Sequence, residues 1–163
     1  MEKTKVMKVN AKNQEGITIN GLDNIEEVEA FTYLGAKMCK EGGGVKDLKN
    51  RLSKARGSFV RLKTIWNSKS VTRKTKLKLY RTLVVLVLLY GCETWKMNKS
   101  DDKEIDVFQN KCIRKILEVR WQDHVSTEEL LERAEMEPLS RDVKRRRWKL
   151  VTYLERITTV MMQ

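Results

Sequence analysis

Two kinds of spacing between hydrophobic residues divide the chain near residue 44. Before that point, apolar and polar residues alternate in three short runs, Lys5–Val9, Ile17–Asn20 and Ala30–Met38. Alternation with a period of two is typical of β-strands. After residue 44, apolar side chains recur every three or four positions from Val45 to Trp66, and this spacing predicts an amphipathic helix.

Helical signals continue toward the C terminus. A second helix is expected over residues 72–90, antiparallel to the first, with Gly91 as a suitable stop. Ser126 and Glu129 have the spacing of a capping box, and a last helix is expected over residues 138–157. The predicted fold class is therefore α+β and mainly α, with a small N-terminal antiparallel β segment followed by a helical bundle.

Three regions follow from this pattern. Residues 1–44 form the β segment, residues 45–95 form a helical hairpin, and residues 96–163 form a helical extension. The apolar run Leu83–Tyr90 is far shorter than the roughly 20 residues that a membrane-spanning helix needs, so it is expected to pack into the core of a soluble protein. No membrane partner and an intracellular location, cytoplasmic or nuclear, are expected.

Positive charge is concentrated in the hairpin. The formal net charge is +12, and residues 45–81 contain thirteen lysines and arginines but only one acidic residue, Asp47. The like charges of such a segment repel one another unless a polyanion is present. Contact with the phosphates of a nucleic acid releases condensed counterions and so favours binding. A solvated basic surface is the simpler alternative. The residues expected to bind nucleic acid are Lys49, Arg51, Lys54, Arg56, Arg61, Lys63, Arg73, Lys74, Lys76, Lys78 and Arg81.

Few residues offer other chemistry. Cys39, Cys92 and Cys112 are widely spaced and accompanied by one histidine, His124, which suggests buried thiols rather than disulfides or a zinc site. The four tryptophans fall one per segment and are expected to pack in the core or at its rim.

Seven short motifs together resemble one family. In order along the chain they are "KTKVM", "FTYLGAKM", "RLSKARGSFVRLKTIWNS", "TKLKLYRTLVVLVLLYGCETW", "VFQNKCIRKIL", "RWQDHVSTEELL" and "RRRWK". This combination resembles the C-terminal part of the reverse transcriptases of non-LTR retrotransposons, especially the RTE-like clade, from the end of the palm through the primer grip and thumb to an extension.

The resemblance implies roles for particular residues. Lys3 corresponds to a lysine proposed to protonate departing pyrophosphate, and the "FTYLG" pattern resembles the primer grip. Its members here would be Phe31, Tyr33, Leu34 and Gly35. The basic hairpin resembles the thumb, whose partner is an RNA or RNA·DNA template-primer, which agrees with the charge concentration found independently.

The family's paired catalytic aspartates stand before the "KT" motif, and this sequence does not contain them. The chain alone is therefore expected to bind nucleic acid without polymerising. No cofactor is expected, although the full-length enzyme uses Mg²⁺, and Lys3 is at most a vestigial general acid. The missing palm and fingers portion is a further candidate partner. Two alternatives stay open, namely a helical protein-interaction module and a decayed element copy without retained function.

Overall fold

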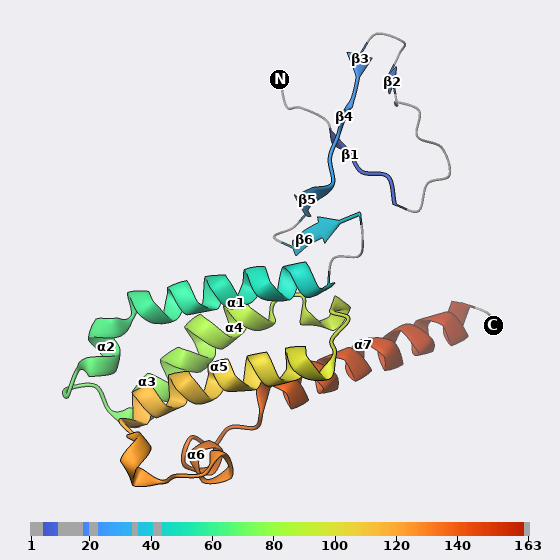
Figure 1. The fold of residues 1–163 in the computed structure, drawn as a ribbon. Coiled ribbons are helices and arrows are strands. Elements are labelled where there is room, and N and C mark those ends of the chain that lie inside the picture. Colours follow the sequence, from blue (N-terminus) through green and yellow to red (C-terminus); the bar gives the residue numbers. More distant parts are fainter. Residues whose placement is uncertain (1–4, 10–17, 20–22, 34–35, 41–43, 162–163) are drawn as a thin grey trace.

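The computed structural model places a small group of strands at one end of a helical bundle (Figure 1). It describes residues 5–9, 18–19, 23–33, 36–40 and 44–161. The mainly α, α+β class expected from the hydrophobic spacing is confirmed. The strands lie above the start of α1 (Gly44–Arg61), and the C-terminal end of the chain projects from the same end of the bundle.

The strands form three two-stranded pairs. β1 (Lys5–Val6) pairs in parallel with β4 (Glu26–Glu27), whereas β2 (Thr18–Ile19) and β3 (Asp23–Asn24) pair antiparallel. The fully antiparallel segment expected from the sequence is thus wrong for β1 and β4. Two strands that are not joined by a tight turn can pair in either direction, and local alternation does not encode which.

The run expected from Ala30 to Met38 is a hairpin. Its strands are β5 (Ala30–Tyr33) and β6 (Ala36–Cys39), paired antiparallel so that Ala30 lies opposite Cys39 and Tyr33 opposite Ala36. β6 also contacts α1, so this hairpin is the part of the β segment that adjoins the bundle.

The helices follow in close succession. After α1 come α2 (Lys63–Asn67), α3 (Arg73–Tyr80), η1 (Arg81–Val85), α4 (Leu86–Leu89), η2 (Cys92–Thr94), α5 (Lys99–Leu117), η3 (Trp121–Asp123), α6 (Thr127–Arg133) and α7 (Leu139–Met161). η2 and η3 are short 3₁₀ turns, and η1 is a π-helical turn within the otherwise continuous helix from α3 to α4.

Local sequence signals set several helix ends. The Thr72 hydroxyl accepts a hydrogen bond from the Thr75 amide at 3.2 Å, which caps α3. Gly91 has a φ of 75°, a left-handed conformation that glycine adopts at little cost, and it ends α4. At α6, Ser126 accepts from the Glu129 amide at 3.1 Å, which is one half of the predicted capping box, while the Glu129 carboxylate accepts from Arg133 instead.

The core lies between α1, the α3–α4 helix and α5, and α6 covers one end of it. Phe59 stacks on Trp66 with ring centroids 5.0 Å apart and meets Tyr80 edge-on at 6.2 Å. These contacts join α1, α2 and α3. Aromatic pairs of this geometry add stability beyond the apolar area that they bury.

The three cysteines are buried free thiols, as expected. Burial raises the pKa of the Cys112 thiol to about 12, and that of Cys92 to about 12 as well. The thiolate is the reactive form of cysteine, so these two thiols are protonated and unreactive at neutral pH.

Only part of the apolar run Leu83–Tyr90 enters the core. Val84, Val85, Leu88 and Leu89 are buried, whereas Leu83, Leu86 and Tyr90 are exposed. The expectation that the whole run packs inside is therefore wrong. A helix at the edge of a bundle buries one face, and this run is apolar on all faces.

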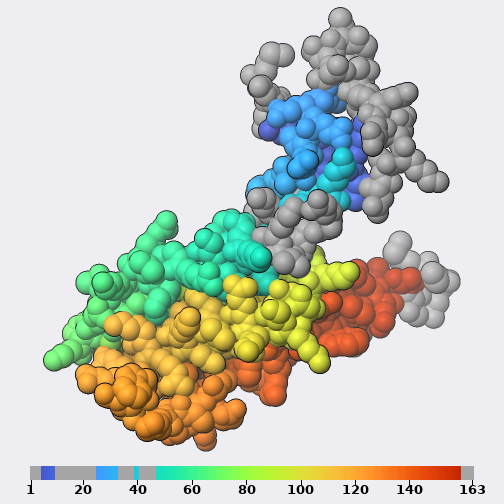
Figure 2. All heavy atoms as spheres, in the orientation of Figure 1, coloured from blue at the N-terminus to red at the C-terminus, as the bar shows by residue number. Residues whose placement is uncertain are grey.

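α7 is buried only at its start. Leu139 and Val143 lie in the core, but residues 148–158 are all exposed, and the helix runs four residues beyond the expected end at Ile157. In Figure 2, the red part of this helix extends past the yellow and orange surface of the bundle.

Candidate nucleic-acid interface

Most of the cations predicted to bind nucleic acid are on the surface of α1, α2 and the α3–η1 helix. Nine of the eleven are exposed, namely Lys49, Lys54, Arg56, Arg61, Lys63, Arg73, Lys74, Lys78 and Arg81. The other two, Arg51 and Lys76, are buried, so their expected place on an exposed binding surface is wrong.

Arg51 is 6% exposed because it belongs to a polar cluster between α1 and the end of α4. Its Nε lies 3.8 Å from Oδ2 of Asp47, and its guanidinium lies over the Tyr90 ring, 4.6 Å from the centroid. The same Asp47 oxygen accepts a 3.0 Å hydrogen bond from Nε1 of Trp95. The single acidic residue of the basic segment, Asp47, therefore contacts buried partners and does not neutralise the exposed cations.

Lys76 is 3% exposed because it holds the end of α2. Its Nζ donates a 2.8 Å hydrogen bond to the carbonyl oxygen of Trp66 and lies 3.8 Å from Oε1 of Glu118. The last carbonyls of a helix lack partners within the helix, and a lysine from a neighbouring helix can supply one. This lysine therefore has a structural role.

The exposed cations of α1, together with Lys63 at the start of α2, form two rows. Lys49, Arg56 and Lys63 are spaced by seven residues, and Arg56 faces α5, where its guanidinium lies 3.3 Å from Oε1 of Glu104. Lys54 and Arg61, also seven apart, lie on the other edge of the helix. The rows predicted on both sides of the apolar face of α1 are thus present, with Arg51 removed from one of them.

Small or uncharged residues separate the two rows. The exposed crest of α1 includes Ser53, Gly57 and Val60, and a Cβ added at Gly57 would have no atom within 4 Å among those described. A backbone approaching this crest would meet little steric obstruction and would have cations on either side.

A second group of cations lines a hollow between α3 and α6. This hollow has a volume of about 750 Å³, and its lining includes the buried Leu77 and Leu117. The basic lining residues are Arg73, Lys74, Lys78, Arg81 and Arg133. Five cations against one acidic residue, Glu135, give the hollow a net positive lining, and a cleft focuses such a potential more than a flat surface does.

Two of these arginines are already bound within the protein. A guanidinium nitrogen of Arg81 donates to the carbonyl oxygens of Ala134 at 2.8 Å and Glu135 at 2.6 Å, which caps the C-terminal end of α6. Arg133 pairs with Glu129 one turn earlier in α6. Arg81 is therefore exposed but structurally engaged, which its sequence position did not indicate.

The other predicted cations lie on the surface without an acidic partner among the described residues. Within the part of the chain that the structure describes, seven predicted residues form neither an ion pair nor a side-chain hydrogen bond. They are Lys49, Lys54, Arg61, Lys63, Arg73, Lys74 and Lys78. This subset is the candidate interface, and we refer to it below as the hairpin cations.

The residues implied by the primer-grip resemblance are described only in part. Phe31 is half-buried in β5 and lies opposite Met38, and Tyr33 is the last residue of β5, paired with Ala36. Lys3, Leu34 and Gly35 lie outside the described residues.

Acidic and metal-binding chemistry is sparse in the described ranges. No group of three or more His, Cys, Asp or Glu side chains among them could hold a metal ion. Asp101 exchanges capping hydrogen bonds with Asn98 at the start of α5, and Asp102 accepts a 2.6 Å bond from Lys144. His124 is exposed after η3.

Sequence reasoning missed the exposure of two tryptophans. Trp66 and Trp95 are buried as expected, but Trp121 and Trp148 are mostly exposed, so the expectation of core or rim packing is wrong for this second pair. The signal in the sequence was the position of Trp148 inside "KRRRWK", where an aromatic residue is surrounded by cations.

No family model matches this chain, and searches of curated proteins and of solved structures found no match. Among the described helices, none combines the length and the apolar character needed to cross a lipid bilayer.

Proposed function

We propose that this chain binds the backbone of an RNA or RNA·DNA duplex through the hairpin cations, as the thumb-like part of a non-LTR reverse transcriptase. The observation that carries the proposal is the group of seven exposed lysines and arginines without an ion pair in the described chain. The motif resemblance supports the same function but is a separate argument.

The physical basis is electrostatic. Each lysine or arginine that meets a phosphate releases condensed counterions, so affinity falls as salt rises. Long flexible side chains contact phosphates without reading bases, so little sequence preference is expected. An A-form duplex is recognised mainly by shape and backbone contacts, which suits a helix crest with cations on both edges.

The proposed function does not include polymerisation. The proposal concerns binding alone, because the cations that carry it are groups that hold phosphates. The proposed contribution is to hold a template-primer, and the palm and fingers portion is the proposed partner that would supply catalysis.

Charge reversal tests the proposal with a matched control. The test variant changes Lys54, Arg61, Lys74 and Lys78 to Glu, all of which are exposed hairpin cations. The control variant changes Lys96, Lys99, Lys103 and Lys111 to Glu, which are equally exposed but lie outside the hairpin. Both variants change the net charge by the same amount, so only the position of the charge differs.

Binding to a labelled RNA·DNA duplex is measured over a range of salt concentrations. If six hairpin cations each meet a phosphate, log affinity against log salt should have a slope of about −4 to −5. The hairpin variant should lose binding, whereas the control should retain most of it. Equal losses in both variants, or a wild-type slope near zero, would refute backbone binding by the hairpin.

A second function is favoured by a different surface. Leu83 and Leu86 are exposed on the α3–α4 helix and Tyr90 directly after it, and neighbouring exposed apolar side chains can dock a protein partner. In a protein-interaction module, the basic hairpin would only aid solubility. The hairpin variant would then bind its protein partner unchanged while nucleic-acid binding was absent in the wild type as well.

A further inference from the structure

The second half of α7 carries two exposed aromatic side chains. Trp148 is 71% exposed and Tyr153 is 61% exposed, because this part of the helix runs past the bundle. Indole and phenol rings are large and mostly apolar, so two of them exposed on one helix face offer a flat apolar surface to a ligand.

The two rings share one helix face with cations. A shallow hollow of about 600 Å³ runs along this face. Its lining residues are Arg145, Trp148, Lys149, Thr152, Tyr153 and Arg156. Their spacings of three, four and seven or eight residues place them on one side of α7. We call this surface the α7 platform.

Aliphatic residues lie on a different face of the same helix. Leu150, Leu154 and Ile157 follow the helical direction that Leu139 and Val143 take into the core. The α7 platform therefore combines aromatic rings with positive charge and leaves the aliphatic side chains elsewhere. That composition differs from an ordinary continuation of the hydrophobic core.

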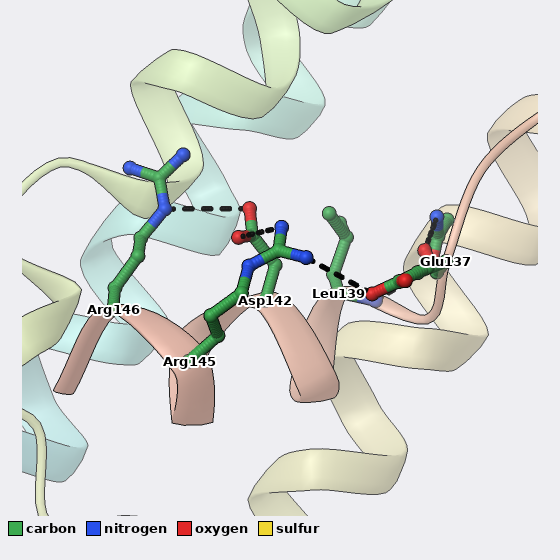
Figure 3. Close-up of polar contacts among 6 residues, drawn as sticks. Glu137, Leu139, Asp142, Arg145 and Arg146 are labelled. Atoms are coloured by element: carbon green, nitrogen blue, oxygen red, sulfur yellow. Dashed lines mark hydrogen bonds and ion pairs between the residues drawn. The ribbon is translucent and has the colours of Figure 1, made fainter. Parts of the chain in front are cut away.

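Some cations near the platform are held by carboxylates, and others are not. Figure 3 shows the Arg145 guanidinium between two acids, 2.8 Å from Oδ1 of Asp142 and 3.2 Å from Oε2 of Glu137, with Arg146 also paired to Asp142. Lys149 and Arg156 form no ion pair with any residue described in the structure. Their charge is available to a ligand.

We propose that the α7 platform binds single-stranded nucleic acid, with an unpaired base stacked on Trp148 and neighbouring phosphates on Lys149 and Arg156. Aromatic side chains beside a cationic track are the general means of binding single strands without sequence preference, because every base has a stackable face. The two cations are about 10 Å apart along the helix, so they can meet different phosphates of one strand.

This site is distinct from the hairpin cations. Bases inside a duplex are stacked on each other, so a duplex offers phosphates to the hairpin but no free base to Trp148. The α7 platform therefore goes beyond the proposed function, and it can exist whether or not the hairpin binds a duplex.

An anionic membrane surface is the competing ligand. An interfacial helix buries its aromatic and aliphatic residues together on one face and keeps its cations on the polar face. In α7, Trp148 and Tyr153 lie among the cations, and Leu150 and Leu154 lie on another face. The arrangement favours nucleic acid.

The test compares two oligonucleotides of equal length and charge, oligo(dT) and a strand of abasic sites, on the full chain. The wild type should bind oligo(dT) about 5- to 150-fold more tightly for one stacked base. Trp148→Leu should abolish this preference, whereas Trp148→Phe should keep most of it, because phenylalanine can stack and leucine cannot. The double variant Lys149→Gln/Arg156→Gln should weaken both strands equally.

Trp121→Leu is the matched control, because Trp121 is 81% exposed but lies in η3, outside the platform. It should leave the preference for oligo(dT) unchanged. Circular dichroism should show no loss of helix in either leucine variant, since both side chains lie outside the core. The hairpin charge-reversal variant should keep the base preference, which separates failure of this site from failure of duplex binding.

Three results would overturn the assignment. The first is a wild type that binds both strands equally, and the second is Trp148→Leu retaining the wild-type preference. The third is binding to phosphatidylserine vesicles that depends on Trp148 in a protein that does not bind oligo(dT), which would assign the platform to a membrane surface instead.

Discussion

The one acidic residue of the basic segment is expected to be a major determinant of stability. Asp47 is almost fully buried, and its Oδ2 lies 3.8 Å from Nε of Arg51 and accepts a 3.0 Å hydrogen bond from Nε1 of Trp95. Residues 47 and 95 lie in α1 and after η2, so the carboxylate ties two distant parts of the hairpin together. We predict that Asp47→Ala severely destabilises the fold.

The magnitude follows from what the alanine would leave behind. Removing one partner of a buried ion pair costs about 3–5 kcal/mol, because the other charge remains in a poorly solvated site. The indole N–H of Trp95 would also lose its acceptor, and a buried donor without a partner costs about 1–3 kcal/mol. The two costs are not additive, because one local rearrangement can give both Arg51 and Trp95 a new partner. We therefore expect a total loss of about 3–5 kcal/mol, compared with about 5–15 kcal/mol for the stability of a typical domain.

Urea unfolding followed by circular dichroism measures the effect, with two comparison variants. Asp47→Asn keeps an oxygen that can accept from Trp95 but removes the charge, so its loss should be intermediate. Glu104→Ala removes a carboxylate that pairs with Arg56 at the surface, and it should cost under about 1 kcal/mol. If Asp47→Ala cost no more than Glu104→Ala, the carboxylate would not hold the interior and the reasoning would fail.

Two further predictions concern α1 and the cysteines. Gly57→Ala should raise the free energy of unfolding by about 0.5–1 kcal/mol, because the added Cβ meets no described atom within 4 Å and alanine favours an exposed helix. A lower free energy of unfolding in urea would contradict this. Burial raises the pKa of Cys92 and Cys112 to about 12, above the ordinary value of 9.0, so unfolding should release protons above pH 9 and stability should fall between about pH 9 and pH 12. The free energy of unfolding should fall by at most about 1.4 kcal/mol per pH unit for each thiol, and this slope should be smaller in Cys92→Ala and in Cys112→Ala. Iodoacetamide should label both thiols at pH 8 only when denaturant is added. Rapid labelling of the native protein would disprove their burial.

Local features of the sequence were enough to predict where most elements begin and end. Thr72 and Gly91 bound the second long helix because a side-chain oxygen and a left-handed glycine act within one turn of the backbone. The spacing from Val45 to Trp66 likewise predicted the buried face of α1, because helical periodicity depends only on residues three or four apart. The π-helical turn η1 and the parallel pairing of β1 with β4 had no such local signal.

What the amino-acid order determined by itself was the helical framework, the buried cysteines and the concentration of positive charge in one segment. Only the tertiary structure decided which of those charges reach the surface. Arg51 and Lys76 look like their exposed neighbours in the sequence, but each meets a partner, Tyr90 or Trp66, that folding brings to it. The same holds for the tryptophans, since burial depends on which helices pack together. Trp148 is exposed because it stands in the part of α7 that extends past the bundle.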